Sequence, residues 1–402
     1  MKKITMILIM MICASTYSDW ELTTSATSND LLNVLFVNSN TGYACGDIGT
    51  IIRTTNSGTT WTALVSGTNE VLTSMAVNPA NINVVYAAGF NGALLKTTNA
   101  GNNWTVQTVG GLYNAIIFTD ANTGVAAGLG GTVYRTTNGG NNWVNVDPGI
   151  GSITIHTLCI GSGVIYGGCA SGKIIKSTNN GLNWSNYQTT SSFAFYGIYF
   201  SNDVTGYAVD NTGRFFKSSN SGVNWSQISM HSGTKFAVVY NGIDLFLCGV
   251  QGKILKTTNK GVNWITQNTG TAIDFYDMQF VNQNVGFAVG EGGSIYRTSN
   301  GGEPIGINNA STLIPGEYSL SQNYPNPFNP STKFKFSLPA GGKVEISIFD
   351  SKGSITEVLF NNELPAGEYE ADWNAGGYAS GVYFFRVRKG SFTETKKMIL
   401  LK

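Results

Sequence analysis

Few side chains in this sequence are placed to act as acids, bases or metal ligands. The two histidines, His156 and His231, stand in different parts of the chain, and neither has potential ligands at a metal-binding spacing. No Gly-x-Ser-x-Gly elbow, phosphate-binding loop or Cys-x-x-Cys pair occurs. A zinc site or an imidazole base is therefore not expected, and we predict no metal and no cofactor.

The pattern that recurs down the chain is Ser/Thr-x-Asn-x-Gly-x-x-Trp. It occurs six times in full and a seventh time, at residues 298–302, without its tryptophan. Successive motif tryptophans are 39 to 43 residues apart, a spacing typical of four-stranded propeller blades. Asparagine can bond the turn backbone, glycine can take a positive φ, and tryptophan can fill the seam between blades. We give this structural role to Asn56, Gly58, Trp61, Asn99, Trp104, Asn138, Trp143, Asn179, Trp184, Asn220, Trp225, Asn259 and Trp264.

Each repeat holds four short runs of strand-forming residues between turn formers, as at residues 32–37, 42–46, 50–54 and 61–64. Trp20 lies one repeat length before Trp61 without an Asn-x-Gly turn ahead of it, whereas the seventh turn has no tryptophan strand after it. We therefore predict an all-β fold with a seven-bladed β-propeller in residues 19–302. The N-terminal strand at Trp20 completes its last blade and removes open sheet edges.

The motif resembles the Asp-box, or BNR repeat. Together with the surrounding Thr-Gly-Tyr-Ala and Lys/Arg-Thr-Thr-Asn segments, it makes residues 19–302 similar to the propeller family of the photosystem II assembly/stability factor. The resemblance implies the propeller fold. No photosynthetic role follows from it, because it concerns the blade and not a partner. Every copy carries asparagine where the Asp-box has aspartate, and a ring of neutral amides is a poor site for Ca²⁺.

Asp-box propellers include sialidases, which clamp a substrate carboxylate with three arginines. Arg53, Arg135 and Arg297 stand directly before the repeated motif, where lysine stands in other repeats, so we assign them to the repeat. Asp47 and Glu291 are the acidic pair that the repeats bring to adjacent blades, in the turn between the second and third strands. Such a pair could act on a sugar bond as acid and base, but we favour two solvated turn residues.

Aromatic residues on that same face are the candidates for ligand contact. In a propeller these turns share a face with the blade-to-blade connections, and the fourth connection, residues 189–196, is the most aromatic. Aromatic side chains on loops stack on sugars or anchor protein partners, although some of these could simply begin the next inner strand. The candidates are Phe90, Tyr113, Phe193, Phe195 and Tyr196.

Residues 1–18 have the charged, apolar and small-residue regions of a secretory signal peptide, with cleavage expected after Ser18. The apolar run is too short to span a bilayer, so we expect no transmembrane segment after signal removal. Four cysteines remain, Cys45, Cys159, Cys169 and Cys248. The repeat places them apart or out of register, and we expect buried free thiols rather than disulfides.

The repeat stops after residue 302. Residues 303–318, which include Pro304, Asn308-Asn309 and Pro315-Gly316, are typical of a linker. Residues 319–402 then form a second domain with alternating runs at 333–338, 343–350, 355–360, 368–373, 382–388 and 392–401. This pattern predicts a small Ig-like antiparallel β-sandwich.

Along its whole length this second domain resembles the C-terminal sorting domain of the type IX secretion system of Bacteroidota and relatives. The match lies in residues 323–330, 364–369, 379–384 and 396–402. It implies recognition by the secretion machinery, export through the outer membrane and, often, domain removal with surface attachment. We assign the sorting motif to Tyr324, Pro325, Asn326, Pro327, Gly367, Tyr369, Gly381, Tyr383, Lys396 and Lys397.

Charged residues make up 12% of the chain and the formal net charge is +1, so no basic field exists to attract nucleic acid and no nucleic-acid partner is expected. The sequence as a whole predicts a secreted propeller on the outer cell surface that acts as a non-enzymatic binding or scaffold module. Its expected partners are the secretion machinery and a surface glycan or protein. The alternative is a glycoside hydrolase or lyase that attacks extracellular polysaccharide through carboxylates on the propeller face.

Overall fold

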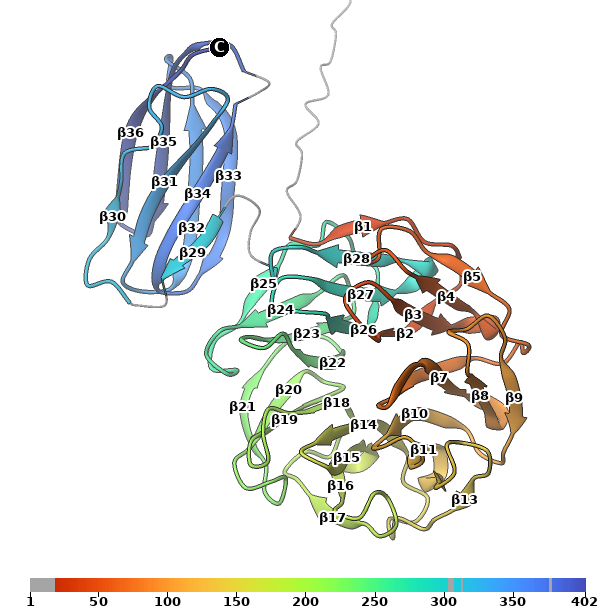
Figure 1. Ribbon diagram of the computed structural model, residues 1–402. Coiled ribbons are helices and arrows are strands. Elements are labelled where there is room, and N and C mark those ends of the chain that lie inside the picture. The colour runs from red at the N-terminus through yellow and green to blue at the C-terminus, as the bar shows by residue number, and fades with distance from the viewer. Residues whose placement is uncertain (1–18, 303–306, 312–313, 376–377) are drawn as a thin grey trace, which may run out of the picture.

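The computed structural model describes residues 19–302, 307–311, 314–375 and 378–402. Within residues 19–302 the strands form seven four-stranded antiparallel sheets, arranged as blades around a central axis (Figure 1). The fold is the predicted all-β propeller. The predicted signal peptide lies outside the described residues. Among the described residues, no helix has the length and apolar character needed to cross a membrane.

In each blade the first strand lies nearest the central axis and the last lies at the rim (Figure 1). Blades one to three are β2 (Leu31–Phe36), β3 (Gly42–Gly46), β4 (Ile51–Thr54), β5 (Thr62–Leu64); β6 (Leu72–Asn78), β7 (Asn81–Gly89), β8 (Ala93–Thr97), β9 (Thr105–Thr108); β10 (Tyr113–Phe118), β11 (Gly124–Gly128), β12 (Val133–Thr136), β13 (Val144–Asn145). Blades four and five are β14 (Ile155–Gly161), β15 (Val164–Cys169), β16 (Lys173–Ser177), β17 (Ser185–Gln188); β18 (Phe195–Phe200), β19 (Gly206–Asp210), β20 (Arg214–Ser218), β21 (Ser226–Met230). Blades six and seven are β22 (Lys235–Tyr240), β23 (Leu245–Gly249), β24 (Ile254–Thr257), β25 (Ile265–Gln267); β26 (Phe275–Phe280), β27 (Gly286–Gly290), β28 (Ile295–Thr298), β1 (Glu21–Thr23).

Blade seven is completed by the N-terminal strand, as the sequence predicted. β1 pairs with β28, so that Glu21 lies opposite Arg297 and Thr23 opposite Ile295. Trp20, just before β1, is fully buried in an apolar cluster drawn from blades six and seven. The two ends of the propeller sequence therefore form one sheet, which covers the hydrogen-bonding edge that β28 would otherwise expose.

The repeated motif forms the turn between the third and fourth strands of each blade. In blade three the Thr136 hydroxyl donates to Asn138 Oδ1 at 3.0 Å and accepts from the Gly140 amide at 2.9 Å. Asn138 Oδ1 also accepts from the Asn142 amide at 2.9 Å, four residues on rather than two. Gly139 and Gly140 both adopt positive φ, which costs glycine little. The same side-chain bonds recur around the ring.

The motif tryptophans lie in the seams between blades. Trp61 of blade one is 6% exposed and packs edge-on against Phe36 of its own blade and Phe287 of blade seven, with ring centroids 5.9 and 6.4 Å apart. Trp225 of blade five occupies a cluster that includes Tyr166 of blade four. Each tryptophan thereby packs its blade against the preceding one. Those that are half-buried in the corresponding seams are Trp104, Trp143, Trp184 and Trp264.

One face of the ring, here called the connection face, carries the blade-to-blade connections and the turns between second and third strands. In every blade the first amide of this turn donates to the carbonyl that precedes the inner strand, for example Asp47 N to Asp30 O at 3.0 Å. The contact is close: a Cβ on Gly46 would lie 1.8 Å from Asp30 O. The turns and the connections therefore share a face, as predicted.

The C-terminal domain is a sandwich of two four-stranded sheets, ordered β29-β34-β31-β30 and β33-β32-β35-β36. Its strands are β29 (Ile307–Ser311), β30 (Ser319–Leu320), β31 (Ser331–Leu338), β32 (Gly342–Phe349), β33 (Ile355–Leu364), β34 (Gly367–Asn374), β35 (Gly381–Lys389) and β36 (Phe392–Leu400). Phe334, Phe385, Ile346 and Trp373 are among the side chains buried between the sheets. The last six strands correspond to the six runs read from the sequence.

Part of the predicted linker belongs to this sandwich. β29 pairs with β34, which places Ile307 opposite Ala371 and Asn309 opposite Tyr369. The sandwich therefore begins before residue 319, the boundary that composition had indicated. An edge strand is stabilised mainly by its partner, so its own residues need not carry a strand pattern.

The cysteines of the described residues are free, as predicted. Cys45, Cys169 and Cys248 are buried, and Cys159 is half-buried. Burial raises the pKa of Cys169 to about 12, so this thiol stays protonated and packs as a small apolar side chain.

Candidate ligand-binding site

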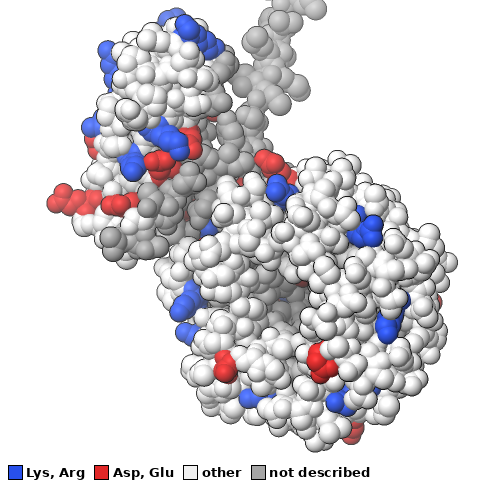
Figure 2. All heavy atoms as spheres, viewed as in Figure 1, with Lys and Arg blue, Asp and Glu red and all other residues white. Residues whose placement is uncertain are grey.

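The central channel contains a cavity of about 400 Å³, lined by the inner strands of all seven blades. The space-filling view shows the ring hollowed at its centre (Figure 2). Each inner strand begins at the connection face and has a β-bulge directly after its first residue. A bulge leaves one residue unpaired and re-aims its neighbours. The second and third residues of each inner strand both line the cavity as a result.

Four successive blades place an aromatic ring at the second position, and we call this set the aromatic arc: His156, Tyr196, Phe236 and Tyr276. His156 lies edge-on to Tyr196 with ring centroids 4.6 Å apart, and Tyr196 stacks on Phe236 at 6.0 Å. Phe236 lies edge-on to Tyr276 at 5.5 Å. All four side chains are half-buried and line the cavity. Because each ring packs against the next, the arc is ordered before any ligand arrives.

The third position ties blades together in the rest of the ring. Asp277 Oδ2 accepts from the Asn33 side-chain amide at 2.6 Å and from the Val34 backbone amide at 3.0 Å, which joins blade seven to blade one. Asn33 Oδ1 in turn accepts from the Met75 amide at 2.8 Å, which joins blade one to blade two. Beside the aromatic arc this position is small in blades five and six, with Gly197 and Ala237, and leaves room for the rings.

Burial sets the charge state of the cavity wall. It lowers the pKa of His156 to about 4, so this ring is a neutral imidazole at pH 7. It raises the pKa of Asp277 to about 6, with the hydrogen bonds from Val34, Met278 and Asn33 acting in the opposite direction. At pH 7 the wall therefore carries a carboxylate at Asp277, and its described residues include no lysine or arginine.

Four further carboxylates surround Tyr276 on the connection face. Burial first, and then Asp30, Glu291, Asp274 and Asp47 in that order, raise the pKa of the Tyr276 phenol to about 12. A phenolate beside these groups would suffer both desolvation and charge repulsion. Tyr276 therefore stays neutral at pH 7, the opposite of the activation that a tyrosine nucleophile needs.

Asp47 and Glu291 lie in neighbouring blades, as predicted, and both flank Tyr276. Glu291 Oε2 accepts from the Asp274 amide at 3.0 Å, and Asp30 Oδ1 accepts from the Gly292 amide at 2.8 Å. Glu291 and Asp30 hold turns together through these two bonds. Within the described residues, no group of three or more His, Cys, Asp or Glu side chains is placed to hold a metal ion.

The five aromatic candidates fall into different environments. Tyr113 and Phe195 are fully buried, so their prediction as ligand contacts is wrong. Both are first residues of inner strands, and this position points into the blade core. Phe90 is half-buried in the short 3₁₀ turn η2 (Phe90–Gly92). Tyr196 lines the cavity, and Phe193 is 43% exposed on the connection that precedes it.

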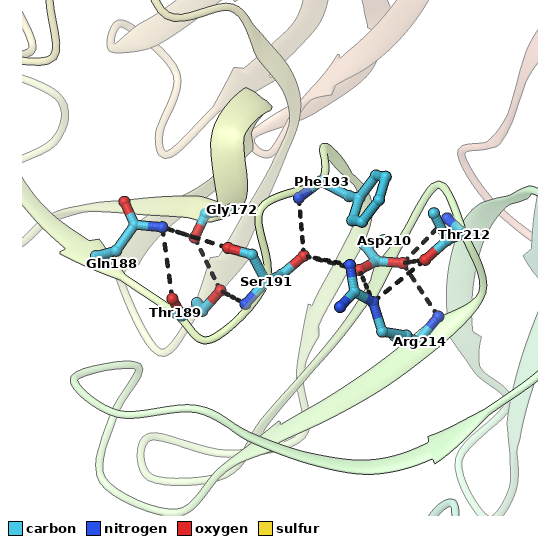
Figure 3. Close-up of polar contacts among 8 residues, drawn as sticks. All are labelled: Gly172, Gln188, Thr189, Ser191, Phe193, Asp210, Thr212 and Arg214. Atoms are coloured by element: carbon cyan, nitrogen blue, oxygen red, sulfur yellow. Dashed lines mark hydrogen bonds and ion pairs between the residues drawn. The ribbon is translucent and has the colours of Figure 1, made fainter.

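Phe193 is held against a mostly buried ion pair (Figure 3). The Arg214 guanidinium lies 4.6 Å from the Phe193 ring centroid, and its Nε donates to Asp210 Oδ2 at 2.9 Å. The Ser191 hydroxyl donates to the same oxygen at 2.8 Å and accepts from the Phe193 amide at 3.0 Å. Asp210 stands where blade one has Gly46, and its Oδ1 accepts from the Thr212 amide at 3.0 Å. Blade five thus fixes the exposed ring of Phe193 on the connection that leads from blade four into the inner strand β18.

The predicted sorting-motif residues divide between core and surface. Tyr369 and Tyr383 are buried, and their phenols donate to the carbonyls of Pro365 and Ala379, each at 2.9 Å. These two shape the turns before β34 and β35. Tyr324 by contrast is 82% exposed.

The rest of the motif lies around the tail strand β36. Asn326 Oδ1, between Pro325 and Pro327, accepts from the Ile399 amide at 2.9 Å. Lys396 pairs with Glu394 at 2.8 Å, and Lys397 lies opposite Phe384. Gly367 begins β34 and Gly381 begins β35.

Reasoning from the sequence found Tyr196 but missed Phe236 and Tyr276, and it set His156 aside as an isolated histidine. Alignment of the inner strands on the repeat puts all four at the same second position, so the signal was present. The repeat did not predict the bulge, which turns that position toward the channel.

A ring of seven four-stranded blades around an aromatic-walled cavity, joined to an Ig-like sandwich, defines a β-propeller protein with an accessory domain. The chain belongs to the family described as photosynthesis system II assembly factor YCF48, which matches residues 12–299. Residues 322–401 match the secretion system C-terminal sorting domain. Both predicted resemblances are confirmed, and the second indicates export by a type IX system. None of the curated protein sequences compared with the chain matches it.

Solved structures with the same fold include YCF48 bound to a D1 peptide, at 20% identity and a TM-score of 0.60, covering 71% of this chain and 97% of that one. YCF48 from Cyanidioschyzon merolae has 16% identity and a TM-score of 0.59, covering 69% and 98%. PorZ, a surface component of the type IX secretion system of Porphyromonas gingivalis, has 12% identity and a TM-score of 0.56, covering 93% and 60%. At these identities the likeness establishes the fold alone.

Proposed function

We propose that this protein is displayed on the outer cell surface after type IX export, where its propeller acts as a binding module without catalysis of its own. The ligand contacts the connection face and enters the central cavity. The observation that carries this proposal is the aromatic arc, because four interlocked rings facing a cavity offer a large contact area at little ordering cost.

Three further observations support the proposal. The Phe193 ring, held against Arg214, lies on the connection that leads into Tyr196, so it adds an aromatic contact outside the cavity. YCF48, which shares the fold, has been solved with a D1 peptide, and this supports a peptide rather than a small metabolite as the ligand. PorZ, described as a surface component, supports a surface location.

The alternative, hydrolysis or lysis of a polysaccharide through Asp47 and Glu291, has less support. Both carboxylates flank a phenol of raised pKa, and the described cavity wall offers no cation for an anionic substrate. Glu291 is engaged with the Asp274 amide. A general acid and base would need to face a shared sugar bond across a site open to substrate.

The test uses the full exported chain on peptide and glycan arrays, together with a reducing-end assay on a polysaccharide panel. We expect ligands that bind the wild type and are lost in the double variant Tyr196→Ala/Phe236→Ala, with no turnover. Tyr187→Ala, a half-buried aromatic on the outer strand β17, is the matched control. Turnover that disappears in Asp47→Asn/Glu291→Gln would establish the hydrolase instead.

A further inference from the structure

The cavity wall combines aromatic rings with negative charge. We propose that it binds the basic side chain of a peptide, lysine or arginine, with the cationic group against the aromatic arc. This inference rests on the proposed binding function and deepens it by naming the chemistry of the ligand.

The aromatic arc supplies the first part of the recognition. A lysine ammonium or arginine guanidinium within about 6 Å of an aromatic face is attracted by the negative face of the ring, more strongly when the site is partly desolvated. Tyr196, Phe236 and Tyr276 line a cavity of about 400 Å³, which suits one long side chain. The aliphatic stem of that side chain can pack on the same rings.

Charge supplies the second part. Asp277 is part of the cavity wall, and Asp30, Asp47, Asp274 and Glu291 surround Tyr276 at its edge. A cation entering past these carboxylates is attracted, whereas an anionic group is repelled. A neutral sugar could stack on the rings but would gain no Coulomb attraction, so the carboxylates favour the basic side chain.

The lysine that neighbours the arc does not line the cavity. Lys235 precedes Phe236 on β22, but its side chain is fully buried and its ammonium donates to the carbonyls of Ser232 and Gly233 at 3.0 and 3.2 Å. Burial lowers the pKa of His156 to about 4, so the arc itself carries no positive charge at pH 7.

Fluorescence anisotropy with the full exported chain tests the proposal. The probes are fluorescein-labelled seven-residue peptides of glycine and serine whose central residue is lysine, arginine, norleucine or glutamate. We expect the lysine and arginine peptides to bind about tenfold or more tightly than the norleucine peptide, and the glutamate peptide most weakly. Binding should weaken as NaCl is raised, since part of the attraction is screened.

Three variants locate the interaction. Phe236→Ala should weaken the lysine peptide about tenfold, and Asp277→Asn should weaken it severalfold while leaving the norleucine peptide unchanged. Tyr187→Ala on the outer strand β17 should bind as the wild type does. Thermal unfolding of each variant shows whether it is folded. Because Asp277→Asn keeps an acceptor for Asn33 and Val34, its binding defect can be read apart from stability.

The outcomes separate this inference from the proposed function. Equal binding of the lysine and norleucine peptides, or a lysine affinity unaffected by Phe236→Ala, overturns the basic side chain as ligand. If array ligands that depend on Tyr196 and Phe236 are all neutral, the inference fails but the binding function stands. If no array ligand depends on these two rings, both fail.

Discussion

Asp277 shows how a single residue serves both the ring and the cavity. Its Oδ2 accepts two hydrogen bonds from blade one, yet the side chain also lines the channel and is only half-buried. In this position the carboxylate is partly removed from water, which raises its pKa to about 6. The folded chain therefore holds a proton that the unfolded chain releases at lower pH.

Asp277→Asn should remove this pH dependence. The native pKa is about 6 against an ordinary value of 3.8, so the free energy of unfolding falls as pH rises through this window and the loss is complete above it. Asparagine Oδ1 can accept the same two bonds without charge. Between pH 4 and pH 7.5 the free energy of unfolding of the variant should therefore rise by about 1 to 2 kcal/mol relative to that of the wild type. This is less than the full pKa shift corresponds to, because the side chain is half-buried.

The measurement is urea unfolding of both proteins across that pH range, plotted as the difference between them. Titrations of all other groups cancel in the difference. If the difference in free energy of unfolding stays constant with pH, or if the variant becomes less stable relative to the wild type as pH rises, the burial of this carboxylate is contradicted.

At the scale of elements, the blade turn shows why asparagine can replace the aspartate of the Asp-box. In the β12–β13 turn only the Oδ1 of Asn138 is used, to accept from Thr136 Oγ1 and from the Asn142 amide. Both oxygens of a carboxylate accept equally well, so either residue satisfies the turn. The repeat therefore records a structural bond, and its chemistry demands neither a charge nor a cation.

Asn138→Ala should lower the free energy of unfolding by about 1 to 2 kcal/mol, because it removes the acceptor of two hydrogen bonds in an exposed turn. Asn138→Asp is the matched control and should stay within about 0.5 kcal/mol of the wild type. Thermal or urea unfolding of the full chain checks both. Equal destabilisation by the two substitutions would show that the amide nitrogen, and not Oδ1, holds the turn.

At the scale of the whole molecule, stability depends on joining the two ends of the propeller sequence. β1 gives blade seven its fourth strand, and Trp20 packs edge-on against Phe280 with ring centroids 5.8 Å apart. The side-chain bonds of Asp277 reinforce the same junction between blades seven and one from the channel side. Loss of the N-terminal strand would expose the edge of β28 to pairing with other chains.

Trp20→Ala should therefore cost about 3 to 5 kcal/mol, the range for large-to-small changes at fully buried aromatic residues. Leu22→Ala in the adjacent strand β1 is the control: Leu22 is 64% exposed and its loss should cost less than about 0.5 kcal/mol. Thermal unfolding and size-exclusion chromatography provide the readouts. A Trp20 variant that melts like the Leu22 variant would refute closure by the N-terminal segment.

The local pattern of this sequence was enough to determine the blades. The repeated Thr, Asn, Gly and Trp form a turn whose bonds lie within eight residues. Trp20, which has no motif turn ahead of it, and the truncated seventh motif implied the closure that the pairing of β1 with β28 now shows. The sorting domain was equally readable, because its six main strands alternate regularly in the sequence.

Only the tertiary structure decided where the ligand site lies. Tyr113 and Phe195 looked available but begin inner strands that point them into the core, whereas Phe236 and Tyr276 gain access to the channel through bulges that no local pattern announced. β29 likewise becomes a strand only through its pairing with β34. Short-range hydrogen bonds can be read along the chain, but a cavity exists only once seven distant strands have been brought around one axis.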